Sequence, residues 1–245
     1  MKQLENRWDD QIMDYLVTNP HMSLRLLGGR AFRLHVVGRV PDVLIRPLGD
    51  LDLFTISKER KVVQELLETI GLKGDREFNL LNGKTRLLYY ANHEKVDVFI
   101  DEFSLCHRID LRERIHLEAQ TLPLADLLLT KLQIVELNRK DMIDLVALLL
   151  VAPLVETDQP SAINIRYLAK MLAKDWGLWR TCTKNLQLLV NEMCTLIADE
   201  MQQSKVLEKI NTLQQAIDLT PKSAAWRMRS VVGERVRWYE LPEEP

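Results

Sequence analysis

The stretches LRLLGGRAFRLH (residues 24–35) and GDLDLF (residues 49–54) decide the expected fold of this chain. Four mostly apolar residues, a glycine pair and a short basic segment predict a strand, a sharp turn and a helix. In the second stretch Asp50 and Asp52 alternate with leucines, which predicts a strand that carries both acids on one face. These are either ordinary turn and strand residues or parts of a site that holds a triphosphate and its metal.

The glycine pair, Gly28 and Gly29, lies within a locally basic segment. Glycines at such a turn let backbone N–H groups approach a phosphate, and a helix N-terminus favours negative charge. Residues 21–49 carry five arginines and one acid, a balance of +4 (5 − 1), in a chain whose net charge is −2. Guanidinium groups suit phosphate oxygens. The alternative is a turn that needs only a positive φ, followed by arginines on a solvated basic face, which applies especially to Arg25 and Arg39. The five arginines of the segment are Arg25, Arg30, Arg33, Arg39 and Arg46.

A second acidic strand is expected at KVDVFID (residues 95–101). Carboxylates about 6.6 Å apart along a strand can converge on hard cations, and two-metal sites hold their ions about 3.5–4 Å apart. Asp101 lies about 13 Å beyond Asp97 and is not expected to join the same site. If the two strands are neighbours, Asp97 completes a three-carboxylate cluster with Asp50 and Asp52. The alternative is that these acids point to solvent from half-exposed strands, although Asp is disfavoured in strands.

The hydrophobic periods divide the chain into an α+β part and a helical part. A first helix is marked by Leu4, Trp8, Ile12, Tyr15 and Leu16, and strands are expected at 24–27, 50–55, 78–81, 85–90 and 95–100, with ANHE as the hairpin turn before the last. A helix from Lys58 to Ile70 is expected to end at Gly71. The segment VVGRVPDVLI (residues 36–45) is expected to form an extra hairpin or a mobile loop.

After about residue 120 the strand signal fades and helices are expected. One or two follow Pro123, and Asn164 and Asp175 are expected N-caps of two more. Thr220 with Pro221 signals a last helix. An apolar stripe is formed by Val206, Ile210, Leu213 and Ile217. We therefore predict a domain of short mixed sheet and flanking helices over 1–118, and an all-α bundle over 119–245 that contributes to the cleft.

Composition restricts the class of protein. The three cysteines form no C-x-x-C pair, so neither a disulfide framework nor a zinc cluster is implied. The longest apolar run, Leu145 to Val155, contains Pro153 and is shorter than the roughly 20 residues of a bilayer span. It is expected to be a buried helix end and its exit. The charged N-terminus is unlike a signal peptide, and a cytoplasmic protein without a membrane partner is expected.

The combination LLGGRAFRLH, RPLGDLDLF and KVDVFID resembles the nucleotidyltransferase fold of the DNA polymerase β superfamily. The downstream segment ADLLLTKLQIVELNRKDMIDL (residues 125–145) resembles the helical motif of AbiEii-like nucleotidyltransferases, many of them toxins of toxin–antitoxin pairs. The resemblance covers roughly residues 20–150. The motif residues of the downstream segment are Lys131, Arg139, Lys140, Asp141 and Asp144, and Arg46 has its counterpart four residues before the D-x-D.

The resemblance implies a Mg²⁺-dependent transfer of a nucleoside monophosphate from an NTP to a hydroxyl. Asp50, Asp52 and Asp97 would bind two Mg²⁺ ions, and Asp97 could help to take the proton. Gly28 and Gly29 would hold the β- and γ-phosphates. Lys131 would be catalytic, and with Arg46 it would neutralise the triphosphate or the leaving pyrophosphate. Further nucleotide-binding residues would be Arg30, Arg33 and Asp144. The alternatives are a snorkelling Lys131 and a helix-capping or interhelical Asp144.

Two departures and several alternatives accompany this interpretation. The gap between Gly29 and Asp50 is long, and RPLGD lacks the serine that is frequent in the toxin branch. The favoured acceptor is a tRNA or other RNA 3′ end, with a protein or small molecule as alternatives and an antitoxin as a further partner. The stretch AAWRMRSVVGERVRW (residues 224–238) either grips RNA or packs its tryptophans on the bundle, which is favoured. The other hypotheses are a non-catalytic nucleotide-binding or interaction protein and a metal-dependent nuclease.

Overall fold

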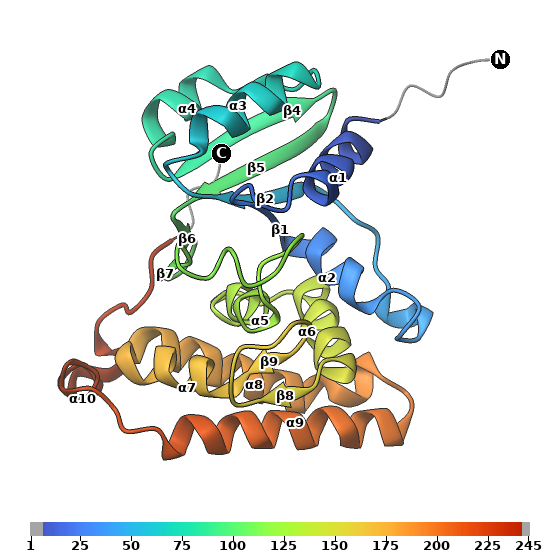
Figure 1. The fold of residues 1–245 in the computed structure, drawn as a ribbon. Coiled ribbons are helices and arrows are strands. Elements are labelled where there is room, and N and C mark those ends of the chain that lie inside the picture. The colour runs from blue at the N-terminus through green and yellow to red at the C-terminus, as the bar shows by residue number, and fades with distance from the viewer. Residues whose placement is uncertain (1–6, 242–245) are drawn as a thin grey trace.

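The computed structural model describes residues 7–241 as a five-stranded sheet with helices, joined to a helical bundle (Figure 1). The predicted α+β class is therefore confirmed. The first part consists of α1 (Trp8–Thr18), β1 (Leu24–Leu27), α2 (Gly28–Val36), β2 (Leu51–Thr55), α3 (Arg60–Thr69), β3 (Lys73–Gly74), α4 (Arg76–Asn82), β4 (Arg86–Ala91) and β5 (Glu94–Ile100). The second part consists of β6 (Glu102–Ser104), β7 (Arg108–Asp110), α5 (Leu124–Leu132), α6 (Arg139–Val151), β8 (Leu154–Val155), β9 (Ile163–Asn164), α7 (Ile165–Lys174), α8 (Trp176–Leu196), α9 (Glu200–Leu219) and α10 (Ala224–Val232).

The sheet has the order β1-β2-β5-β4-β3. Strand β2 pairs antiparallel with β1 and parallel with β5, and β4 is antiparallel to both of its neighbours. The two acidic strands are neighbours, which is the condition on which the expected cluster of Asp50, Asp52 and Asp97 depended. Asn92, with φ 57°, and His93 form the tight turn between β4 and β5, as the ANHE signal predicts.

Helices α3 and α4 lie over one side of the sheet, and the bundle lies on the other (Figure 1). The end of α3 follows the predicted pattern, because Gly71 has φ +92° and Leu72 N–H donates to the Leu67 carbonyl. Helix α1 buries Ile12 and Leu16. The predicted contribution of Leu4 to its face lies outside the described residues.

The bundle is built around apolar helix faces. Helix α6 is buried along most of its length and ends at Val151, which confirms the predicted buried helix end and exit. Asn164 and Asp175 cap α7 and α8 as predicted, with side chains that accept hydrogen bonds from Tyr167 N–H and Leu178 N–H. The stripe of α9 is buried, again as predicted: Val206, Ile210, Leu213 and Ile217.

Several local predictions are wrong. Residues 78–81 form part of α4, not a strand, because the Asp75 side chain caps that helix by accepting from Phe78 N–H. Of the two alternatives for residues 36–45, the extra hairpin is not formed, because the segment contains a short 3₁₀ helix, Asp42–Leu44, and no strand. The last helix begins after the Ser223 cap rather than at Thr220.

Two further features differ from the prediction. The helical part contains a small parallel pair, β8 and β9, so the part of the chain after residue 119 is not strictly all-α. Arg25 is only 2% exposed, and its guanidinium donates to the backbone carbonyls of Glu118, Met22 and Leu24. It is a structural residue that joins β1 to the chain after β7, not part of a solvated basic face. No helix among residues 7–241 is long and apolar enough to cross a membrane.

Candidate active site

A hollow of ≈ 210 Å³ lies where the sheet meets the bundle. We call it the carboxylate pocket. Strands β2 and β5 contribute its acids, the start of α2 contributes backbone, and α5 contributes Thr130 and Lys131. Its lining includes the turn glycine Gly28, the three strand acids Asp50, Asp52 and Asp97, and the two lysines Lys95 and Lys131. Both predicted parts of the chain therefore line one pocket.

The acids of the two strands meet in this pocket. Asp52 and Asp97 are direct partners in the parallel register of β2 and β5. Asp50 is exposed and lines the same pocket from the residue before β2. The structure thus places two predicted ligands side by side and the third at the solvent-facing end of the D-x-D.

Asp97 and Asp52 differ sharply in their partners. The buried Asp97 carboxylate receives Arg86 at 2.7 Å and Lys95 at 3.1 Å. Two cations therefore already neutralise the Asp97 carboxylate in this pocket. The Asp52 carboxylate makes no hydrogen bond or ion pair with another residue in the range 7–241. Burial, together with Asp97 and Asp50, raises the pKa of Asp52 to about 7, against the opposing charges of Lys131 and Lys95.

Both glycines lie where an added Cβ would meet a neighbouring side chain. Gly28 has φ +62°, and a Cβ built there would lie 1.8 Å from Oδ2 of Asp52. A Cβ at Gly29 would lie 2.3 Å from the Arg46 guanidinium. Helix α2 starts at this point, and no side chain caps its N-terminus. Its first N–H groups and partial positive charge therefore belong to the wall of the carboxylate pocket, which is the arrangement that suits a phosphate.

A chain of charges runs from Arg46 to Lys131. The Arg46 guanidinium donates to both oxygens of Asp144, at 2.9 and 2.6 Å. Lys131 Nζ lies 3.5 Å from Asp144 and 2.5 Å from Asp141. Lys131 therefore does not snorkel away from the core: its ammonium is fixed between α6 and the pocket, where its charge acts on Asp52. Asp144 of α6 thus forms an ion pair with Lys131 of α5, which is the interhelical alternative to a nucleotide-binding role. Its contacts orient both Arg46 and Lys131.

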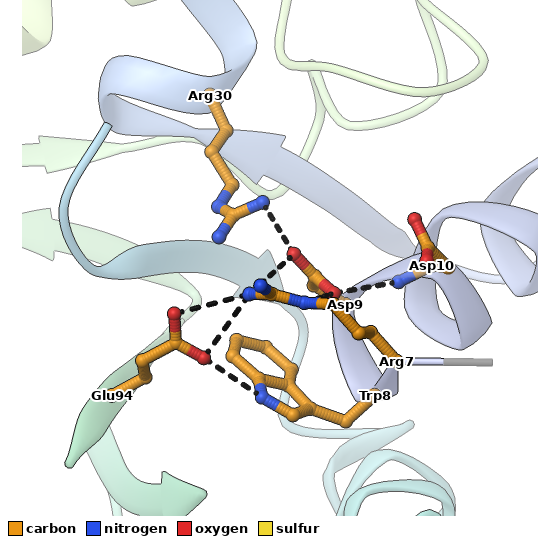
Figure 2. A network of polar contacts seen from close by, with 6 residues as sticks. All are labelled: Arg7, Trp8, Asp9, Asp10, Arg30 and Glu94. Atoms are coloured by element: carbon orange, nitrogen blue, oxygen red, sulfur yellow. Dashed lines mark hydrogen bonds and ion pairs between the residues drawn. The ribbon is translucent and has the colours of Figure 1, made fainter. Parts of the chain in front are cut away.

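Two predicted phosphate ligands have other partners in this structure. Arg30 donates to Asp9 at 3.1 Å and lies 5.9 Å from the Trp8 ring (Figure 2). Figure 2 also shows that Glu94, beside the pocket residue Lys95, binds Arg7 and Trp8. Arg30 therefore joins α2 to α1, while Arg7 and Trp8 join the start of α1 to the start of β5.

Arg33 likewise has a structural contact, since it donates to the Arg46 carbonyl at 2.7 Å. It holds the connection between α2 and β2, and thereby the position of Arg46. From the downstream motif, Arg139 donates to the Thr195 carbonyl and Lys140 is exposed. These motif residues do not line the carboxylate pocket.

Sequence reasoning missed Arg86 and Lys95. Lys95 could have been found, because strand alternation puts it on the same face as Asp97. Arg86 is opposite Phe99 in the register of β4 and β5, and this register is set by the hairpin. Only the pairing of the two strands brings its guanidinium to Asp97.

The donor set fits a hard divalent cation in its chemistry, but the site is not a preformed metal cluster. In the described part of the chain, no group of three or more His, Cys, Asp or Glu side chains could hold a metal ion. Asp52 nevertheless offers a half-buried carboxylate without an ion pair, with Asp97 beside it and Asp50 in the same pocket. Carboxylate oxygens are what Mg²⁺ binds, so these are the residues that would hold it.

The basic and aromatic stretch near the C-terminus packs largely on the bundle. The rings of Trp226 and Trp179 have centroids 5.0 Å apart, and those of Trp238 and Trp176 are 6.1 Å apart. The favoured prediction, tryptophans packed on the bundle, is confirmed for both. A larger, open hollow of ≈ 730 Å³ lies between α8 and α9, away from the acids.

Comparison with known proteins does not assign the chain to a family. No protein-family model matches the chain, and no curated protein matches it.

Proposed function

We propose that this protein is a Mg²⁺-dependent nucleotidyltransferase of the AbiEii-like type, which moves a nucleoside monophosphate from an NTP to a hydroxyl. One observation carries the proposal. The carboxylate pocket combines paired strand acids, an uncapped helix start at Gly28 and a fixed lysine, Lys131. A triphosphate with its metal needs these three elements together: carboxylates for the cation, N–H groups for the phosphates and a cation for the leaving group.

The proposed division of labour follows the geometry. Asp52 and Asp50, with Asp97, would hold Mg²⁺, which when bound supplies charge neutralisation and a lower pKa for the attacking hydroxyl. Gly28 brings the α2 N-terminus against the phosphates without a side chain in the way. Lys131 neutralises charge that develops toward pyrophosphate.

The reaction exchanges one P–O bond for another. The acceptor oxygen attacks the α-phosphorus and forms a new O–P bond. The bond from the α-phosphorus to the bridging oxygen breaks, and pyrophosphate leaves with the electron pair. The hydroxyl proton leaves to solvent at the pocket mouth, where Asp50 is exposed. An RNA 3′ end is the favoured acceptor, and an antitoxin partner and a cytoplasmic location belong to the same proposal.

The experiment combines the protein with Mg²⁺, each α-labelled NTP, and total RNA, cell protein or an aminoglycoside panel in separate reactions. Label that enters one acceptor fraction with wild-type protein is the expected result. It should be lost in Asp52→Asn and kept in Asp218→Asn, an exposed acid on α9. No label and no nucleotide binding by calorimetry would refute the proposal.

A nucleotide-binding protein without transferase activity is the second candidate. The two ion pairs that neutralise Asp97 favour it, because they occupy an acid that the transfer reaction would use. It predicts calorimetric binding of NTP that persists in Asp97→Asn, with no label in any acceptor fraction.

A further inference from the structure

A second hollow of ≈ 170 Å³ adjoins the carboxylate pocket. We call it the side pocket. It lies between the β6–β7 hairpin, the start of β4 and the last described residues of the chain. Its polar lining residues are Asn82, Thr85, Glu102, Ser104, Arg108 and Glu240.

The two pockets share a wall. Arg86, Phe99 and Leu105 line both. The Arg86 guanidinium binds Asp97 at 2.7 Å and lies 5.1 Å from the Phe99 ring centroid. A molecule in the side pocket therefore lies on the other side of Arg86 from Asp97.

The wall contributed by the end of the chain is held in place. After α10 the chain runs beside the bundle up to β6 and β7 (Figure 1). Trp238 donates from Nε1 to Thr181 at 3.0 Å, and Glu240 N–H donates to the Cys106 carbonyl at 2.9 Å. The Glu240 carboxylate also pairs with Arg108 at 3.2 Å. These contacts fix Glu240 at the rim of the side pocket.

The chemistry of the side pocket indicates what it can hold. Its volume of ≈ 170 Å³ suits a group the size of a single ring. Carboxylate, amide, hydroxyl and guanidinium groups offer both donors and acceptors, while Phe99 and Leu105 offer an apolar surface. A sugar ring matches this, because its hydroxyls lie at the rim and its C–H groups on the faces.

We propose that the side pocket is the acceptor subsite and takes a hydroxyl-bearing sugar ring, with the Arg108–Glu240 pair at its rim. This inference rests on the proposed nucleotidyl transfer. A ring hydroxyl reaches across Arg86 to the α-phosphorus, forms the O–P bond and displaces pyrophosphate with its electron pair, while its proton goes to solvent. The sugar is either the terminal ribose of an RNA or a ring of a free small molecule.

The test separates the side pocket from the nucleotide site. Ser104 lines the side pocket and not the carboxylate pocket, so Ser104→Phe fills the former alone. Ser204→Phe, at an exposed serine of α9, is the matched control. Calorimetry measures the affinity for a non-hydrolysable NTP with Mg²⁺. Initial rates measure label transfer to tRNA, to tRNA with a periodate-oxidised 3′ ribose and to an aminoglycoside panel.

The expected result is nucleotide affinity within about twofold of wild type and at least about a tenfold loss of transfer for Ser104→Phe, with Ser204→Phe unchanged. Transfer to intact but not to oxidised tRNA would identify the terminal ribose, and transfer to an aminoglycoside a free sugar. Wild-type transfer rates in Ser104→Phe would overturn the subsite. So would an equal loss of nucleotide affinity, which would assign the side pocket to the nucleotide.

A second variant guards against a misfolded hairpin. Arg108 is largely exposed, so Arg108→Gln leaves the core intact. We expect a raised acceptor KM with kcat and nucleotide affinity retained. If the wild-type protein binds nucleotide but transfers label to none of the sugar probes, the assignment of the side pocket to a sugar is wrong and the proposed function is not affected. If it binds no nucleotide, the proposed function is wrong as well.

Discussion

Alanine at three glycines separates backbone strain from steric conflict at the carboxylate pocket. Gly28 combines φ +62° with a Cβ position 1.8 Å from Asp52. Gly38 has φ +71° and nothing within 4 Å of its Cβ position. Gly29 has no positive φ, and its Cβ position meets only the end of the Arg46 side chain, at 2.3 Å. Gly28→Ala thus tests strain and steric conflict together, Gly38→Ala tests strain alone, and Gly29→Ala tests a contact with a flexible side chain alone.

The magnitudes follow from these geometries. Gly38→Ala should lower the free energy of unfolding by about 1 kcal/mol, the cost of a left-handed conformation with a Cβ. Gly28→Ala adds displacement of the Asp52 carboxylate, and we expect a total of about 3 kcal/mol, since overpacking adds about 1–3 kcal/mol. Gly29→Ala should stay within about 1 kcal/mol of wild type, because Arg46 can move and alanine restricts the unfolded chain.

Urea unfolding followed by far-UV circular dichroism at pH 7 measures the three values, and calorimetry with a non-hydrolysable NTP measures binding. Only Gly28→Ala should also abolish nucleotide binding, while Gly38→Ala should retain it. If Gly28→Ala were no more damaging than Gly38→Ala, the close packing of Gly28 on Asp52 would be refuted. The same holds if Gly29→Ala were as damaging as Gly28→Ala.

Three further predictions concern stability. The pKa of Asp52 rises to about 7 from its usual 3.8, so the native state favours the protonated acid and loses stability as pH rises from about 4 to about 7. At pH 8 the free energy of unfolding of Asp52→Asn should exceed that of wild type by about 2 kcal/mol, after discounting for partial exposure, and a difference that does not change between pH 4 and pH 8 would contradict this. Burial, with the charge of Arg39, lowers the pKa of His35 to about 4. The free energy of unfolding should therefore fall by about 2 kcal/mol as pH drops from 6.5 to 4. His35→Gln should remove this loss, as measured by unfolding at acid pH. Asp144→Ala leaves the Arg46 guanidinium unpaired and should cost about 3 kcal/mol in urea, whereas Glu156→Ala in an exposed pair should cost less than about 1 kcal/mol.

The two acidic strands and the glycine turn were predictable because their signals are local. Strand alternation places Asp50 and Asp52 on one face whatever the neighbours are, and a glycine pair between strand and helix needs no tertiary information. The apolar stripe of α9 and the caps Asn164 and Asp175 are local in the same sense. These elements match the structure closely.

The errors arose where distant residues decide. The segment FNLL has the composition of a strand, but Asp75 caps it as a helix and Asn79 binds the backbone of Leu88 from both amide atoms. Arg25 looked like a surface arginine, yet carbonyls from two chain segments bury it. Nothing in a window around Asp97 indicates Arg86, since β-sheet register brings it there.

The carboxylate pocket concentrates features that each lower stability. Gly28 adopts a positive φ, the α2 N-terminus lacks a side-chain cap, and Asp52 lies unneutralised beside Asp97. The unneutralised acid and the missing cap can each be removed by a common substitution without harm to the hydrophobic core, and Gly28 is needed because it packs so closely on Asp52, so a chain under selection for folding alone would not keep all three in contact. Strained and unpaired groups collect at sites where a ligand completes them. A cation would neutralise Asp52 and a phosphate would cap α2, and one ligand, a metal-bound triphosphate, would do both.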